Sequence, residues 1–274
     1  MDEPREPDLI EVSHLLIPDR EALVELLAEL EPSEWTKPTV CRGWDVRDVA
    51  LHIVGGDFGN IAIRRDDVAY LKPTPDEDLV SFVNRINSEW VVAARRLTPR
   101  LIQELLRFTA QPIHQCLTSV DRAAVDANVS WASPDPVPRW LDVAREYMER
   151  WVHQQHIRDA VGRPGQDGEQ FVAPVIAASM FALPIALQAV RSGPVVVHVE
   201  GPGGGSWVVR AHGSGWKLFT GDVAGAAARL RIEAGDWWRT VTLGLTVDEA
   251  LARAYTEGDR NLARSALGAV AIIA

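Results

Sequence analysis

Three residues in this sequence have the types and the spacing of a metal site. Glu149 and His153 are four residues apart in a segment that is predicted to be helical, so both side chains leave the same face. A carboxylate and an imidazole placed in this way can bind one divalent ion, with a third ligand from elsewhere in the chain. His52 is the best candidate for that ligand. Asp48, one helical turn earlier, is placed to accept the second N–H of its imidazole.

Two simpler interpretations of these residues stay open at this point. A glutamate and a histidine four apart on a helix usually form a surface ion pair. A histidine among apolar neighbours, as His52 is between Leu51 and Ile53, is more often a core residue with satisfied hydrogen bonds. His156 lies three residues beyond His153 and near the same face. We predict that it does not bind the metal, because ligation from three such positions of one helix strains the geometry.

Familiar motifs for other chemistry are missing from the sequence. It has no HExxH, CxxC or GxSxG pattern and no phosphate loop, and the glycine run 201–205 is interpreted as a hairpin turn. The two cysteines, Cys41 and Cys116, are too few for a disulfide framework or a cysteine-type zinc finger. Cys41 is predicted to be a packing residue, because no histidine lies close to it in the sequence.

Length and composition exclude several classes of protein. The chain has 274 residues, of which 47% are hydrophobic and 24% charged, as in a globular protein of one large domain or two smaller ones. Its net charge of −10 argues against nonspecific binding to nucleic acid or to an anionic membrane. The uncharged segment 171–190 is long enough to span a membrane, but its alanines and two prolines favour a buried helix. The polar N-terminus shows no signal peptide, so we expect a cytoplasmic protein.

The positions of apolar residues predict the elements that carry these side chains. Helices are expected at 19–30, from Asp45 into the sixties, at 79–97, from Thr98 to about 117, and at 140–161. Asp45 has the position of an N-cap for the helix of His52, with Asp48 at the third position. The last four of these are long helices, and four long helices with short or proline-rich links predict a bundle.

The pattern changes near residue 170. Segments 195–200, 207–211 and 216–220 are predicted strands joined by glycine turns, which gives an antiparallel meander, and 226–232 is a further strand candidate. Helices are expected at 234–244, 247–255 and 260–270. We therefore predict an α+β protein, with a metal-binding four-helix bundle over residues 1–168 and a smaller mixed α+β domain with an antiparallel sheet over 169–274.

Much of the sequence resembles one known family. Residues 35–52, WTKPTVCRGWDVRDVALH, closely resemble the N-terminal motif of the mycothiol-dependent maleylpyruvate isomerase family, which belongs to the DinB-like metal-binding bundles. Residues 149–162, ERWVHQQHIRDAVG, resemble the second metal motif of that family. The tail, with WWR at 237–239, Gly244, EGD at 257–259 and VAII at 270–273, is more loosely similar to the family's sterol-carrier-protein-like C-terminal domain.

The resemblance implies a cofactor and a type of reaction. It implies a zinc ion, or another divalent metal, held by His52, Glu149 and His153 with the fourth position open, and mycothiol as a thiol co-substrate. Zinc deprotonates a coordinated thiol, and the thiolate is the nucleophile. Addition of that thiolate to an electrophilic small molecule leads to cis–trans isomerisation or to S-transfer, which share the addition step.

Five further residues are candidates for contact with the substrate. Arg85, next to Asn84 on an expected helix, is our first choice to bind an anionic substrate, since arginine binds carboxylates bidentately. Arg239 in the C-terminal part is the second choice. Trp44, Asn84 and His156 are candidates for other substrate contacts.

Two other functions remain open on the sequence. One is a metal-dependent hydrolase on the same bundle, with zinc-bound water as the nucleophile. The other is a non-catalytic binding module in which the metal is structural or absent. The expected partners are a small electrophile and a low-molecular-weight thiol, with no nucleic acid and no membrane. The sequence does not indicate the oligomeric state.

Overall fold

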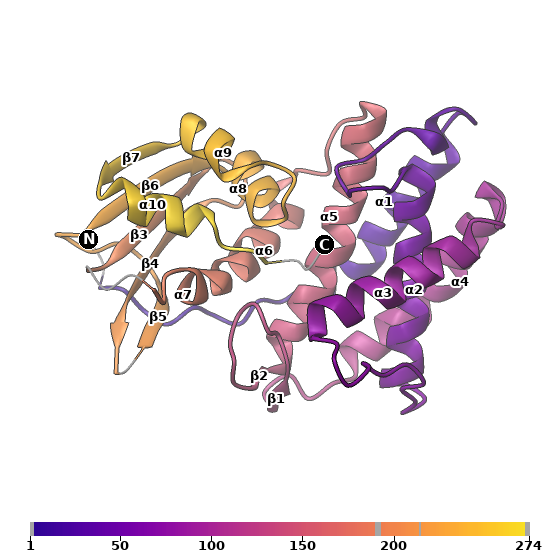
Figure 1. Ribbon diagram of the computed structural model, residues 1–274, viewed down its shortest axis with the longest axis horizontal. Coiled ribbons are helices and arrows are strands. Elements are labelled where there is room, and N and C mark those ends of the chain that lie inside the picture. The colour runs from indigo at the N-terminus through magenta and orange to yellow at the C-terminus, as the bar shows by residue number, and fades with distance from the viewer. Residues whose placement is uncertain (1–2, 190–192, 214, 272–274) are drawn as a thin grey trace. The chain divides into compact units, whose positions relative to one another are not determined.

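The computed structural model describes residues 3–189, 193–213 and 215–271 (Figure 1). The chain forms two compact units. Among the described residues, the helical unit contains 12–121 and 149–166, and the sheet unit contains 3–11, 122–148 and 167–271. Residues 122–148 therefore group with the sheet unit, although the domain boundary expected between 168 and 169 stays a prediction. Ile272 and Ile273, which belong to the resemblance in the tail, lie outside the described residues.

The helical unit contains the helices that the sequence predicts. They are α1 (Leu16–Ala28), α2 (Val46–Arg64), α3 (Leu79–Ala94), α4 (Pro99–Thr118) and the second part of α5 (Arg139–Val161). The short 3₁₀ helix η1 (Glu34–Thr36) was not predicted. Most ends agree with the predictions within a few residues. Helix α1 begins before Pro18 rather than after it, because proline is tolerated within the first turn of a helix.

A shared apolar core packs these helices together. Side chains from all five of the α helices are buried in it, among them Leu23, Leu27, Val49, Val91, Leu106 and Ile157. Helix α2 starts at the predicted N-cap, where the Asp45 carboxylate accepts a hydrogen bond from the backbone N–H of Asp48 at 2.9 Å. The Asp48 carboxylate in turn accepts one from the N–H of Asp45, which completes a capping box. The cap fixes where α2 begins, and hence where its later residues lie.

A buried ionic network joins the same helices. Asp57 of α2 is fully buried, and its carboxylate binds Arg20 of α1 at 2.7 Å and Arg150 of α5 at 3.0 Å. The hydroxyl of Thr109 in α4 donates to it at 2.6 Å. A buried carboxylate is costly unless it is paired and hydrogen-bonded. The network therefore holds α2 and α5 in one relative position.

The sheet unit contains a five-stranded sheet in the order β5-β4-β3-β6-β7. The predicted meander is confirmed as β3 (Val195–Glu200), β4 (Gly205–His212) and β5 (Gly215–Thr220) in antiparallel pairing. Strand β6 (Ala228–Glu233) runs parallel to β3, so the sheet is mixed rather than purely antiparallel. Helices α8 (Ala234–Val241) and α10 (Arg260–Leu267) contact β3 and β6 (Figure 1).

Two features of this unit were not predicted. The expected helix at 247–255 ends early as α9 (Val247–Arg253), and β7 (Tyr255–Gly258) follows, paired antiparallel with β6. A small hairpin of β1 (Val125–Ala127) and β2 (Val137–Pro138) precedes α5. Such short strands are defined by their partners more than by their own pattern of residues.

The apolar segment expected as one buried helix is divided into three pieces. These are α6 (Glu169–Ser179), the 3₁₀ helix η2 (Met180–Ala182) and α7 (Leu183–Ala186), while Val190, at the end of the predicted segment, lies outside the described residues. By length and composition the stretch Glu169–Ala186 is able to cross a membrane, but 44% of its residues are buried in the protein. Core helices pass the same test, and here the indole N–H of Trp237 donates to the hydroxyl of Ser179 at 2.8 Å.

Candidate metal centre

The three predicted metal ligands lie together in the helical unit. Oε1 of Glu149 is 3.2 Å from Nε2 of His52 and 3.0 Å from Nε2 of His153. The two imidazole rings are 4.6 Å apart between centroids and nearly perpendicular, at 75°. One ligand atom from each of the three residues lies within 4.8 Å of the others. Helix α2 supplies His52 and α5 supplies the other two, so the packing of these helices creates the group.

The residues present fit a bound zinc ion. Bond lengths of about 2.0–2.2 Å to nitrogen and oxygen in a tetrahedral arrangement separate neighbouring ligand atoms by about 3.4 Å. The two distances from Glu149, 3.2 and 3.0 Å, are close to this value. Two imidazoles and one carboxylate also form the ligand set of well-known catalytic zinc sites that leave a position for water or substrate.

The charges of these residues are strongly coupled. Burial lowers the pKa of His52. Burial alone raises the pKa of Glu149, but the charge of His153 and hydrogen bonds with both histidines hold it well below its usual range. Burial lowers the pKa of His153, yet the charge of Glu149 and contacts with Cys41 and Glu149 raise it to about 10. Because a histidine binds a metal in its deprotonated form, metal binding here competes with protonation of His153.

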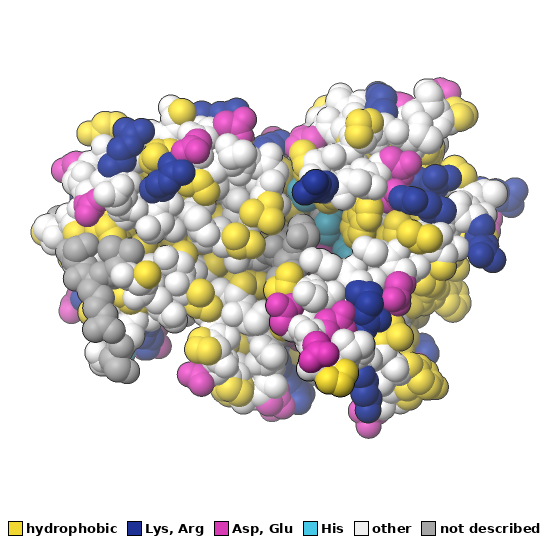
Figure 2. Space-filling view, in the orientation of Figure 1, with side chains coloured by type: hydrophobic (Ala, Val, Ile, Leu, Met, Phe, Trp, Pro, Cys, Tyr) yellow, Lys and Arg dark blue, Asp and Glu magenta, His cyan; other side chains and the backbone are white. Residues whose placement is uncertain are grey.

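A cavity of about 250 Å³ adjoins the ligands. Two of them, His52 and His153, line it, and the other lining residues are Cys41, Arg42, Trp44, Asn84, Asn87 and Ser88. The Trp44 ring lies 5.0 Å from that of His52 between centroids. Histidine (cyan) is visible on one face of the molecule beside a basic side chain (dark blue) in Figure 2. The cavity thus combines candidate metal ligands with an aromatic ring and several polar side chains.

Comparison with known proteins identifies the family of this chain. The model of the mycothiol maleylpyruvate isomerase N-terminal domain matches residues 18–158, just over half of the chain. The chain belongs to this family. Two solved structures of a mycothiol-dependent maleylpyruvate isomerase, one of them a point mutant, match 86% of this chain and 89% of theirs, with a TM-score of 0.53 and 9% identity. At that identity the likeness shows a shared fold. The comparison with curated proteins finds no match.

The structure of this family member places two of the predicted substrate contacts at the cavity. Trp44 and Asn84 line it, as do three residues that the sequence analysis missed: Arg42, Asn87 and Ser88. The sequence could have indicated Asn87 and Ser88, because they lie three and four residues after Asn84 on α3 and so share its face. Arg42 lies within the motif 35–52 that carries the family resemblance.

The structure does not bring Arg85 to the cavity. Its guanidinium binds both carboxylate oxygens of Glu77, at 2.8 and 2.9 Å, and also contacts Glu89. Adjacent residues of a helix point about 100° apart, so Arg85 leaves α3 in a different direction from Asn84. Arg85 is therefore paired with Glu77 and does not line this cavity, and its contact with an anionic substrate stays a prediction.

Arg239 lies in the sheet unit. Its guanidinium stacks on the ring of Trp238, with Cζ 4.2 Å from the ring centroid, and donates to the carbonyl of Gly235 at 3.0 Å. These local contacts hold the side chain along α8. A role for Arg239 in substrate binding stays a prediction.

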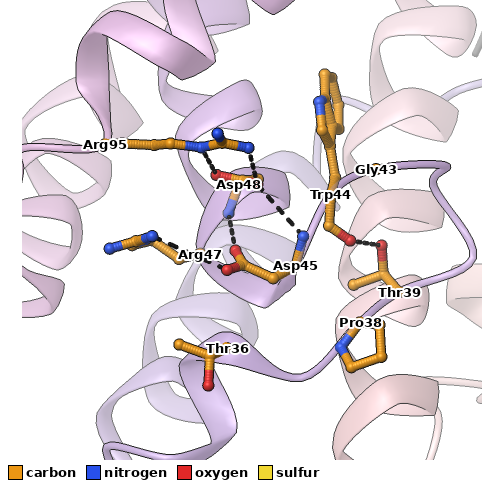
Figure 3. Close-up of a pocket in the computed structure, with 9 residues that line it drawn as sticks. All are labelled: Thr36, Pro38, Thr39, Gly43, Trp44, Asp45, Arg47, Asp48 and Arg95. Atoms are coloured by element: carbon orange, nitrogen blue, oxygen red, sulfur yellow. Dashed lines mark hydrogen bonds and ion pairs between the residues drawn. The ribbon is translucent and has the colours of Figure 1, made fainter.

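Asp48 has a different role from the one predicted. It was expected to accept a hydrogen bond from His52, but both of its oxygens bind Arg95, at 2.9 and 2.7 Å (Figure 3). Its carboxylate also caps the start of α2, which directs it away from the next turn of the helix. In the preceding turn the hydroxyl of Thr39 donates to the carbonyl of Trp44 at 2.9 Å. Asp48 and this turn position α2 rather than the imidazole itself.

Cys41 is more than a packing residue. Its Sγ lies 3.2 Å from Nδ1 of His156 and 3.8 Å from Nδ1 of His153. Cys41 is buried in the apolar core of the helical unit, as predicted. Its contacts with the two histidines were not predicted, because both lie more than a hundred residues away in the sequence, on α5. His156 faces Cys41 and lies outside the group of His52, Glu149 and His153. It is also absent from the cavity lining, so its predicted contact with substrate stays a prediction.

Proposed function

We propose that this family member is a metal- and thiol-dependent isomerase that acts on a small unsaturated acid such as maleylpyruvate, with mycothiol as the thiol. The observation that carries the proposal is the group of His52, Glu149 and His153 beside a cavity of about 250 Å³. Membership of the mycothiol maleylpyruvate isomerase family supports both the thiol and the reaction type.

The three ligands would hold a zinc ion or a similar divalent metal. Zinc supplies one chemical effect here: it lowers the pKa of a coordinated thiol, which is about 8.5 when free, so that the thiolate is present at neutral pH. Glu149 would contribute a negative charge, and His52 and His153 would bind through the Nε2 atoms that face Glu149. The indole of Trp44 lies beside His52 and would form part of the wall around a bound thiol.

The remaining cavity residues would bind and orient the two small molecules. Asn84, Asn87 and Ser88 offer amide and hydroxyl groups that exchange hydrogen bonds with polar groups of the thiol. Arg42 offers a guanidinium to a substrate carboxylate, and it forms no ion pair with the other residues that the structure describes. Arg42 therefore takes the role that the sequence analysis gave to Arg85.

The reaction leaves the thiol unchanged. The sulfur of the thiolate forms a bond to one carbon of the double bond, and the electron pair of that double bond moves onto the conjugated carbonyl. Rotation then occurs about the resulting single bond. The electron pair returns, the carbon–sulfur bond breaks, and the same thiolate leaves the trans product. Residues that hold the carboxylate and the thiol favour this sequence by keeping sulfur and carbon within reach.

Assays of turnover from which either mycothiol or the metal is omitted test the proposal. Purified protein loaded with Zn²⁺ should isomerise maleylpyruvate only when mycothiol is present, and removal of the metal with a chelator should stop the reaction. The variant His52→Ala should lose more than about 100-fold in rate, whereas Cys116→Ser should match the wild type. An unchanged rate without mycothiol would overturn the proposal in favour of a zinc-bound water as the nucleophile. Loss of free thiol during turnover would instead indicate S-transfer.

A further inference from the structure

A second group of potential ligands lies directly beside the first. Cys41, His153 and His156 each offer a ligand atom, and these atoms lie within 4.8 Å of one another. All three side chains are buried, with exposed fractions of 8%, 3% and 3%. We propose that these residues form a second metal site, specific for zinc or a similar thiophilic divalent ion, which shares His153 with the first site.

The orientation of His153 separates the two sites. Its Nε2 faces Oε1 of Glu149 at 3.0 Å, whereas its Nδ1 faces Sγ of Cys41 at 3.8 Å. The lone pairs of the two ring nitrogens point in widely different directions, so one ion cannot bind both. Cys41 is therefore not a fourth ligand of the first site. It belongs to a separate group on the other side of the same ring.

The distances in this second group fit zinc. Bonds of about 2.3 Å to sulfur and 2.0–2.1 Å to nitrogen separate the two kinds of ligand atom by about 3.6 Å in a tetrahedral site. Sγ of Cys41 lies 3.2 Å from Nδ1 of His156 and 3.8 Å from Nδ1 of His153, on either side of that value.

The ligand types select the class of metal. A thiolate with two imidazoles suits zinc and other thiophilic ions, whereas calcium and magnesium require oxygen ligands. Binding would release the thiol proton of Cys41, and a ring bound through both nitrogens would also release its N–H proton. Cys41 and His153 both line the cavity of about 250 Å³, which gives an ion a path to this group.

A hydrogen-bonding role alone is the simpler alternative. A histidine that binds a metal usually donates its second N–H to a carboxylate, a backbone carbonyl or water. Here the neighbour of that nitrogen is a thiol, and a second imidazole faces the same sulfur. Three ligand atoms therefore lie within 4.8 Å of one another, which a single hydrogen bond does not require. An ion at this point would hold His153 from its far side and fix the ring for the first site.

Titration of the metal-free protein with Co²⁺ tests the second site directly. A thiolate bound to Co²⁺ gives a charge-transfer absorption in the near ultraviolet, and the first site contains no thiolate. The wild type should bind two equivalents of Co²⁺ and show this band. Cys41→Ser should lose the band and one equivalent, and His156→Ala should weaken the band. Cys116→Ser, which changes the only other cysteine, should behave as the wild type.

The outcomes also separate this proposal from the proposed function. His52→Ala should lose the first site yet keep the band, because the ligands of the second site are intact. Absence of the band in the wild type at saturating Co²⁺, or its survival in Cys41→Ser, would overturn the second site. If the wild type bound only one equivalent of Co²⁺ and still showed the band, His153 would not be shared between two ions. None of these readouts depends on mycothiol or turnover, and circular dichroism of each variant checks that it is folded.

Discussion

Nε2 of His52 lies 3.2 Å from Oε1 of Glu149, although 97 residues separate the two in the chain. The contact joins α2 to α5, and the buried network around Asp57 holds the same two helices together. Glu149 is central to the group, because it also lies 3.0 Å from Nε2 of His153. Its carboxylate provides the only negative charge among the three ligands of this site.

Replacement of that carboxylate should therefore abolish metal binding at the first site. In Glu149→Gln the side chain keeps its size but loses its charge, so zinc affinity should fall by at least about 100-fold, more than for residues that only contact ligands. Competition with a chromophoric chelator measures the affinity. Glu104→Gln, which changes an exposed glutamate of α4, is the matched control. Equal zinc affinity in the wild type and Glu149→Gln would remove Glu149 from the ligand set.

Arg42 and Arg85 should differ sharply in their effect on substrate binding. Arg42 lines the cavity, whereas Arg85 is occupied by Glu77. Loss of a charge-assisted hydrogen bond costs about 1.5–3 kcal/mol, so Arg42→Ala should raise KM for an anionic substrate by at least about 10-fold. Arg85→Ala should leave KM within about twofold of the wild type, since the partly buried ion pair of Arg85 with Glu77 contributes to stability and not to substrate binding. Steady-state kinetics on both variants measures KM. A larger increase in KM for Arg85→Ala than for Arg42→Ala would favour Arg85 as the residue that binds the substrate.

Gly55 and Gly56 should respond in opposite ways to an added methyl group. A Cβ on Gly55 would lie 2.4 Å from Cδ1 of Trp90, whose indole N–H donates to the carbonyl of Leu51 at 2.7 Å. Gly55→Ala should therefore destabilise the protein by about 1–3 kcal/mol. A Cβ on Gly56 meets no atom within 4 Å, and Gly56→Ala should stabilise α2 by about 0.5–1 kcal/mol. Urea unfolding of the two variants gives the comparison, and equal stabilities would show that Trp90 moves aside freely.

Asp19 should make the protein less stable as the pH rises. Burial raises the pKa of its carboxyl group from 3.8 to about 7, despite the nearby charges of Arg20 and Arg150. The folded protein then holds this proton more tightly than the unfolded chain does. The resulting stability is fully present below about pH 4, declines as the pH rises, and is lost above about pH 7.

Substitution of Asp19 isolates this effect from other titrations. The difference in free energy of unfolding between Asp19→Asn and the wild type should shift in favour of the variant between pH 5 and pH 8. Urea unfolding at the two pH values provides the measurement. Asp66→Asn, at an exposed ion pair with Arg65, should show no such shift. A constant difference for Asp19→Asn would mean that Asp19 is ionised in the folded protein throughout this range.

The sequence by itself determined the features that depend on local geometry. Glu149 and His153 share a face because a helix repeats every 3.6 residues, and this holds wherever the helix lies. The N-cap at Asp45 depends on hydrogen bonds within four residues. The strands between 195 and 220 follow from β-branched runs and glycine turns. His52 was the best candidate for the third ligand from its residue type and neighbours, and the family motif supported it, although no local rule fixes its position relative to Glu149.

Only the tertiary structure decided which distant side chains meet. Cys41 lies beside His156 because the turn before α2 packs against α5, and no periodicity connects residues so far apart. Arg95 donates hydrogen bonds to Asp48, and Arg85 donates to Glu77, and neither pair was predicted from the sequence. The parallel pairing of β6 with β3 likewise depends on contacts between residues that are far apart in the sequence. These contacts depend on how helices and strands pack, and packing is set by the combined shape and charge of many residues rather than by any short pattern.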